Sequence, residues 1–423
     1  MTTSARASSR YIATSLFWQV FVFLLALLIM FPVPLLRYSS RYPLHTPYFA
    51  LVLFFPIFLH SLTVLPTHYF KSRFTKFVWL LRCLAIAQIL LAQFYTQFSN
   101  SSYVAAVGFW LFSILYEVGY YLALKQQWEA ILKRCAQFAN FICIALLVYI
   151  IPLLLQEGPQ ILAPNNSTRA FLRQYVFAWP NYLSIYLVVI FWLIAYFSQT
   201  NRRYIWLLGI TLLTILITFS RTGVTVLAIT IFLWMWHQRR RRLLVILIAL
   251  GLMLSISSGV VIYRTRASSP GDTLSQTLTN RVRRWEVAFE KWAEHPILGY
   301  GFQSYTEVAP TFYAISPSDE DVVSEMNSSH NDYVDLLVRG GILHSLAFWG
   351  FVVMLLFTGL RVSARDKKRG VLQYFGYIFL ALLLAAFVQN PFKNSVLLTF
   401  FWYLAGVEAC LSQKIEASQE ISK

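Results

Sequence analysis

Apolar segments long enough to cross a membrane recur from one end of the 423-residue chain to the other. A helix needs about 20 apolar residues to span the hydrocarbon core of a bilayer, and there it satisfies its own backbone hydrogen bonds. Only 13% of the residues are charged and 58% are hydrophobic, unlike the composition of an average soluble domain. We therefore predict an all-α, polytopic membrane helix bundle that forms a single domain over residues 1–423. Its twelve expected spans are 11–36, 48–66, 77–97, 102–124, 138–156, 180–198, 204–219, 222–236, 243–263, 333–360, 371–389 and 395–413.

Lysine and arginine residues predict the orientation, because short cytoplasmic loops retain positive charge. If the N-terminus is cytoplasmic, most basic residues fall on the cytoplasmic face, including the RRRR run at 239–242. We interpret this run as an anchor at the surface of membrane lipids, and we predict no nucleic-acid partner. Both termini are then cytoplasmic. The four cysteines show no metal-binding spacing, and the sequence predicts neither a metal site nor a cofactor.

Two of the expected outer loops are long, namely 157–179 and 264–332. The second contains NRVRRWEVAFEKWAEHPILGYG at 280–301, which predicts an amphipathic helix capped by Asn280 and ended by Pro296 and the glycines after it. Its apolar stripe has helical spacing and consists of Trp285, Ala288, Phe289 and Trp292. We therefore predict that 264–332 forms an extended, partly helical periplasmic loop, or lid, between the ninth and tenth spans.

Several arginines on the outer face run against the charge rule and are candidates for an anion site. Arg221, in the short break FSRTG, lies at or below the expected membrane surface, where an unpaired cation is costly. Arg281 and Arg284 flank the apolar stripe of the loop helix. The alternatives are snorkelling of Arg221 to the interface, and lipid headgroups or nearby glutamates as partners of the loop arginines. Secondary candidates, whose facing the sequence does not fix, are Arg173, Arg264 and Arg266.

The segment NSSHNDYVDLLVRGG at 327–341 places His330 immediately before the tenth span. The helix N-terminus and nearby arginines would disfavour a charged imidazole, so His330 is expected to stay neutral and available as a base. Asn331 is expected either to orient the histidine or to cap the helix. The alternative for His330 itself is a structural role as a cap or hydrogen-bonding group.

Four motifs in order resemble the bacterial O-antigen ligase and polymerase superfamily. They are SRTG at 220–223, R-x-x-x-W at Arg281 and Trp285, HPILGYGFQSY at 295–305, and HNDYVDLLVRGG at 330–341. The resemblance implies a glycosyltransferase of the bacterial inner membrane, acting at the periplasmic face without a metal. It also implies an undecaprenyl diphosphate-linked glycan as donor, and catalytic roles for Arg221, Arg281 and His330. His344 stands where the family often has glycine, which affects local packing.

The chemistry of such a transfer requires these residue types. Negative charge builds on a departing lipid diphosphate, and guanidinium groups, permanently charged and able to bind phosphate oxygens in pairs, can stabilise it. The acceptor hydroxyl must lose a proton, for which a neutral imidazole is suited near pH 7. The acidic triplet at 319–321 resembles a metal site, but it has no partner carboxylate in the first outer loop, and we interpret it as a solvated turn.

We predict an O-antigen ligase that transfers the glycan to lipid A-core oligosaccharide, with inversion as the expected stereochemical outcome. A polymerase that joins repeat units on the same lipid carrier is the alternative, with a second glycan as acceptor. A solute or anion transporter is the third possibility. It would need ionisable groups near the bilayer midplane, for which Glu117 and His344 are the candidates.

Overall fold

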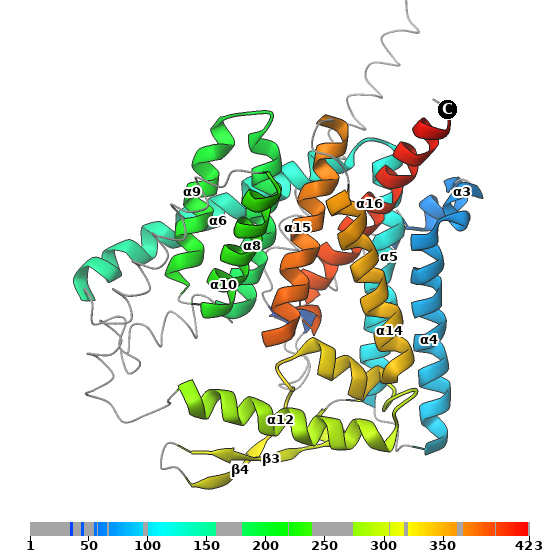
Figure 1. The fold of residues 1–423 in the computed structure, drawn as a ribbon, viewed down its shortest axis with the longest axis vertical. Helices are drawn as coiled ribbons and strands as arrows, with labels where there is room; N and C mark the ends of the chain where they lie inside the picture. Colours follow the sequence, from blue (N-terminus) through cyan, green and yellow to red (C-terminus); the bar gives the residue numbers. More distant parts are fainter. Residues whose placement is uncertain are drawn as a thin grey trace, which may run out of the picture.

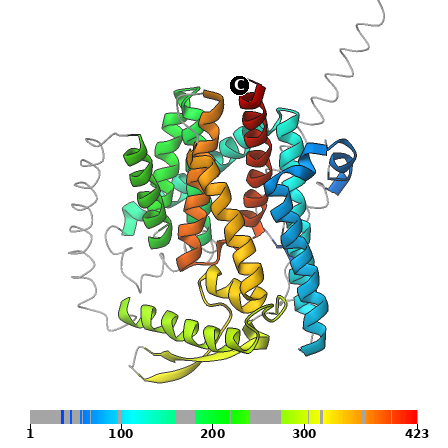
Figure 2. The ribbon, with the colours of Figure 1, turned by 45° about the vertical axis from the view of Figure 1, so that its right-hand side comes forward.

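The computed structural model describes one helical bundle with a polar layer across one of its ends (Figures 1 and 2). Long helices stand side by side, and α12 lies crosswise beneath them, at the end opposite the C-terminus. The described residues are 34–36, 44–45, 55–56, 58–65, 67–95, 100–157, 180–218, 220–238, 274–303, 305–316, 320–361, 367–393 and 395–421.

The helices confirm a mostly helical protein, and nine of the twelve expected spans correspond to described helices. The longer helices of the bundle are α4 (Arg73–Tyr95), α5 (Asn100–Leu124), α6 (Trp128–Glu157), α8 (Pro180–Ser198), α9 (Arg203–Ile217), α10 (Arg221–His237), α14 (Asp332–Arg361), α15 (Lys367–Val388) and α16 (Ser395–Ile421). Shorter helices are α3 (Thr67–Lys71), α13 (Tyr305–Val308) and the 3-10 turn η3 (Pro391–Lys393). Several helices run past the predicted boundaries, because backbone hydrogen bonding continues into polar sequence that apolar-run counting does not detect.

Five of the described helices are long and apolar enough to cross a membrane. These are Ala105–Leu124, Trp128–Leu153, Asn181–Ser198, Asp332–Arg361 and Gly370–Val388. The structure thus supports a multi-pass membrane protein. The expected spans 11–36, 48–66 and 243–263 lie wholly or partly outside the described residues. The described end of the first is not helical, since Pro34–Leu36 forms strand β1 and pairs with β2 (Leu44–His45).

The end layer contains a β-hairpin, which corrects the all-α prediction. Strands β3 (Thr311–Ile315) and β4 (Asp321–Glu325) pair antiparallel beneath α12 (Leu274–Glu294) (Figure 1). In β3, Phe312 and Ala314 are buried while Thr311 and Tyr313 are exposed, the alternation of a strand with one covered face. The sequence TFYAI carries this two-residue period, but it is short and lies in a polar loop.

α14 is broken at Gly341, whose backbone has φ 63° and ψ −174°. A break in a helix leaves backbone N–H and C=O groups without their usual partners inside the helix. Residues 296–302 form hydrogen bonds with these groups. Tyr300 and Phe302 donate their N–H groups to the carbonyls of Val338 and Arg339, at 2.9 and 3.2 Å. Beyond the break, the N–H of Ile342 donates to the carbonyl of Pro296, at 2.9 Å. The segment after α12 is therefore joined to α14 by backbone pairing.

Two glycines permit this close approach. A Cβ on Gly341 would overlap the carbonyl oxygen of Ile297, and a Cβ on Gly299 would overlap the backbone of Gly341 and Arg339. Both residues also have positive φ, where other residues are strained. Beside the break, His344 is buried, and its Nδ1 lies 3.1 Å from Oε1 of Gln88 on α4. The side-chain amide of Gln88 also donates to the carbonyl of Gly340. His344 is thus accommodated by packing against α4.

We predict that Gly341→Ala destabilises the protein strongly, whereas Gly350→Ala does not. Gly341 has a backbone conformation that essentially only glycine adopts, which costs about 1–3 kcal/mol for a residue with a Cβ, and the overlap with Ile297 adds to this cost. Gly350 lies on the same helix, and there a Cβ would make one ordinary contact, with Phe77 at 3.9 Å. The measurement is the thermal unfolding midpoint of each variant in detergent. Equal midpoints for the two variants would contradict the role given to the break.

Candidate functional site

The loop helix α12 is fixed to the hairpin by polar side chains. Asn280 Nδ2 donates to the carbonyl of Ile315 at 3.1 Å, and the N–H of Ile315 donates back to Asn280 Oδ1 at 2.7 Å. Arg283 lies 2.6 Å from Asp321 on β4. The prediction that Asn280 caps the helix is wrong, because α12 begins at Leu274. The side-chain amide of Asn280 pairs with β3 instead. The interpretation of Asp321 as solvated agrees with its exposure, although it pairs with Arg283.

The next residues of α12 hold the turn that precedes His330. Arg284 Nη1 donates to the carbonyl of Ser328 at 3.1 Å, and its guanidinium lies 4.4 Å from the centre of the Phe312 ring. Trp285 Nε1 donates to the carbonyl of Ser329 at 3.0 Å. Successive residues of one helix therefore fix two successive carbonyls of the turn. The R-x-x-x-W motif contributes its tryptophan to this contact.

His330 itself is half-buried and has a left-handed backbone, with φ 55°. A residue other than glycine in this region is uncommon and is held there by its surroundings. The neighbouring Ser329 supplies much of that restraint. Its Oγ donates to Asp335 Oδ1 at 2.5 Å, and its N–H donates to the same oxygen at 3.0 Å. The position of the imidazole thus depends on a preorganised turn.

Asn331 is the N-cap of α14, which is one of the two roles predicted for it, the other being to orient His330. Its Oδ1 accepts the N–H groups of Tyr333 and Val334 at 2.9 and 3.3 Å. Such a cap satisfies backbone donors that have no partner within the helix. The side-chain oxygen of Asn331 is used in this way, so the structure gives it a capping role.

The first turn of α14 is also tied to the segment after α15. Asn390 Nδ2 donates to Asp335 Oδ2 at 2.7 Å and to Asp332 Oδ1 at 3.1 Å, while the N–H of Phe392 donates to Asp332 Oδ2 at 2.9 Å. Sequence reasoning missed Ser329 and Asn390. Both are neutral side chains whose importance comes only from the carboxylates they meet, and the Asn-Pro pair at 390–391 indicated no more than a turn.

Arg221 begins α10 at the same end of the bundle. Ser220 caps this helix, because its Oγ accepts the N–H of Gly223 at 3.3 Å. The same hydroxyl donates to Asn181 at 2.9 Å and accepts from Ser184 at 2.8 Å, which fixes the start of α10 to α8. Arg221 is exposed, and the N-terminus of a helix adds positive potential beside it.

Electrostatics link Arg221 to the loop helix. The pKa of Arg281 is lowered, first by burial and then by the positive charge of Arg221. The pKa of Arg284 is lowered by burial and by the charge of Arg281. Three cations from two distant parts of the sequence are therefore neighbours. Within the described residues, neither Arg221 nor Arg281 forms an ion pair with an acidic side chain.

The structure thus brings Arg221, Arg281 and Arg284 together, and Arg284 joins them to the turn that carries His330. The secondary candidates Arg173, Arg264 and Arg266 lie outside the described residues. In chemical terms this end of the bundle combines a cluster of three arginines with an imidazole on the turn that Arg284 holds. Such a pair suits a reaction in which a charged group leaves and a proton is removed.

We predict that Arg284→Ala lowers the stability of the end layer more than Arg283→Ala. Arg284 loses a charged hydrogen bond and a contact with an aromatic face, together worth about 2 kcal/mol. Arg283 loses an ion pair whose acidic partner is 60% exposed, and such pairs contribute less than about 1 kcal/mol. Hydrogen exchange at residues 326–332 is the measurement. Faster exchange in the Arg283 variant than in the Arg284 variant would contradict this assignment.

Comparison with known families places the site in context. Residues 206–349 match the family described as O-Antigen ligase. This segment runs from α9 into α14 and includes Arg221, Arg281, His330 and the broken helix at Gly341. The resemblance predicted from the four motifs is confirmed over these residues. No curated protein matches the chain.

Proposed function

We propose that this chain, whose segment 206–349 belongs to the O-antigen ligase family, transfers a glycan from undecaprenyl diphosphate to lipid A-core oligosaccharide. The transfer takes place at the periplasmic face of the bacterial inner membrane, with both termini in the cytoplasm. Segment 264–332 forms the periplasmic lid over the reaction. The acting residues are Arg221, Arg281 and His330, and no metal takes part.

The observation that carries the proposal is the pair Arg221 and Arg281. They are 60 positions apart in sequence, yet the charge of one lowers the pKa of the other, and neither has an acidic partner in the described residues. Placing two cations together costs free energy, and a bound anion can offset that cost. A lipid diphosphate carries the charge to do so, and guanidinium groups match its oxygen geometry.

In the proposed reaction, these residues account for the proton and for the charge of the leaving group. The acceptor hydroxyl gives its proton to the imidazole of His330, and its oxygen forms a bond to the anomeric carbon of the donor glycan. The bond from that carbon to the diphosphate breaks, and its electron pair leaves with the diphosphate oxygen. Arg221 and Arg281 stabilise the charge that grows there. Attack opposite the leaving group inverts the anomeric configuration.

In this proposal Arg284 and Asn331 are positioning residues, which hold the backbone on either side of His330. Arg284 holds the carbonyl of Ser328, and Asn331 caps the helix that follows the histidine. The outer-loop residues Arg173, Arg264 and Arg266 are proposed as further contacts to the donor, on their charge and their place in the loops.

Ligase and polymerase are separated by the acceptor. Purified protein in lipid vesicles is given a labelled donor together with either lipid A-core or a second lipid-linked repeat unit. Product formed on lipid A-core supports the ligase. Product formed only on the second repeat unit would show that the protein is a polymerase and not a ligase. A polymerase would use the same diphosphate site.

We expect Arg221→Ala and Arg281→Ala each to reduce transfer by about 10²- to 10³-fold, because each removes a cation that opposes charge in the transition state. Arg283→Ala is the matched control. It lies on the same helix as Arg281 but is paired with Asp321, so transfer should change less than about threefold. Near-normal transfer by Arg281→Ala would assign that arginine to lipid headgroups instead.

We expect His330→Ala to bind the lipid-linked donor normally but to lose transfer by about 10²- to 10⁴-fold, as for removal of a general base. Binding is measured by retention of labelled donor in the absence of acceptor. The variant His330→Asn provides a control for the backbone, because asparagine also tolerates the left-handed conformation. It should be as inactive as the alanine variant. Loss of donor binding in both variants, or full activity of His330→Gln, would make the histidine structural.

A further inference from the structure

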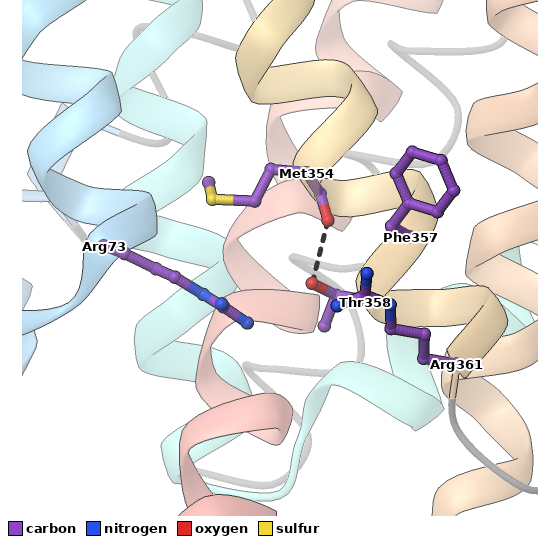
Figure 3. Close-up of a pocket in the computed structure, with 5 residues that line it drawn as sticks. All are labelled: Arg73, Met354, Phe357, Thr358 and Arg361. Carbon is purple, nitrogen blue, oxygen red and sulfur yellow. Dashed lines mark hydrogen bonds between the residues drawn. The ribbon is translucent and has the colours of Figure 1, made fainter.

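A second site with two arginines lies at the opposite end of the bundle from α12. Arg73 begins α4 and Arg361 ends α14, and between them is a pocket of about 320 Å³. Met354, Phe357 and Thr358 line the rest of it. Figure 3 shows the side chain of Arg73 reaching from α4 toward α14, with the guanidinium of Arg361 beside Thr358.

The polar half of this pocket suits an anion. Thr358 Oγ1 donates to the carbonyl of Met354 at 2.8 Å, and its own lone pairs remain to accept. Arg73 meets one acid, Glu416 on α16, at 3.5 Å, and both side chains are more than half exposed. Exposed pairs of this kind contribute little, so another anion can replace the carboxylate. No ion pair of Arg361 occurs within the described part of the chain.

The other half of the pocket is apolar and continues along the helix. Phe357, Val353 and Leu346 are 51%, 37% and 67% exposed. Together with Gly350, which is also exposed, they follow one another at intervals of three or four residues and form a single stripe on α14. This stripe starts at the pocket and runs toward the middle of the bundle. A ligand with a charged head and a long apolar tail fits both halves.

We propose that this pocket binds an anionic phospholipid, with its phosphate between Arg73 and Arg361 and an acyl chain along the α14 stripe. A soluble phosphate would use the arginines but not the stripe. A zwitterionic lipid would use the stripe but would bring its own cation toward the two arginines. The site is separate from the donor site, because the whole upright length of α14 lies between them (Figure 1).

The test is native mass spectrometry of the detergent-purified, full-length protein with phosphatidylglycerol or phosphatidylcholine of identical acyl chains. Wild-type protein should retain phosphatidylglycerol preferentially. In the double variant Arg73→Gln/Arg361→Gln that preference should fall by about tenfold or more, since each cation at a membrane surface contributes about 1 kcal/mol. Both side chains are on the surface, and an unchanged thermal unfolding midpoint confirms that the double variant folds.

Two controls separate this site from general charge and from the donor site. Arg202→Gln/Arg203→Gln removes the same charge from two exposed residues at the start of α9, and it should keep the preference. Arg281→Ala should also keep it. Equal loss in either control overturns the proposal in favour of diffuse attraction or of binding at the donor site.

Two further outcomes concern the ligand. Phe357→Ser keeps both arginines but interrupts the stripe, and it should weaken retention of phosphatidylglycerol. If millimolar inorganic phosphate displaces the lipid, or if Phe357→Ser has no effect, the pocket takes a soluble anion and the lipid proposal is wrong.

Discussion

The break in α14 at Gly341 determines how the polar end layer meets the bundle. A continuous helix would satisfy its own backbone and offer nothing to the segment after α12. The break exposes carbonyl and N–H groups, and residues 296–302 bind them within a short stretch of backbone. Because a buried unpaired backbone group costs as much as a lost hydrogen bond, the two segments are held in one register.

This register fixes the elements that carry the site. α12 leads directly into residues 296–302, which bind α14. The position of these residues therefore sets where the C-terminal end of α12 lies. Arg284 and Trp285 then reach the turn before His330 from one side, while Asp335 holds the same turn from the other. The histidine is left with a strained backbone and a fixed place. Strain of this kind persists only where the surroundings over-determine it, and here both α12 and α14 contribute.

Some elements of the fold and of the candidate site could be predicted from sequence because they carry a clear periodicity or motif, and others could not. The apolar spans and the amphipathic helix have strong periodicities, so their existence was predictable from sequence. The start of α12 was not, because the six residues before Asn280, LSQTLT, contain only two apolar side chains, too few to establish a helical period. Asn280 also resembled a cap, whereas its side chain pairs with Ile315. The hairpin was missed because five-residue strands give a weak signal beside long helices. The neighbourhood of Arg221 and Arg281 was predictable only through the motifs, since nothing local links residues so far apart.

The partners of the charged groups bear on the third possibility, a transporter. Transport would need an ionisable group inside the bundle that is free to bind and release its cargo. Glu117 is instead held by Arg82 at 2.7 Å, with both side chains fully buried, and it also accepts a hydrogen bond from Tyr69.

The guanidinium of Arg82 is in turn shared with the hydroxyl and carbonyl of Ser113 at 2.8 Å each. Removing one member of such a buried set leaves an uncompensated charge, so the set resists exchange. At the end of the bundle the opposite holds, because Arg221 and Arg281 repel each other and lack acids in the described residues. Among these charged groups, the ones without an acidic partner in the described residues therefore lie at the end of the bundle and not inside it.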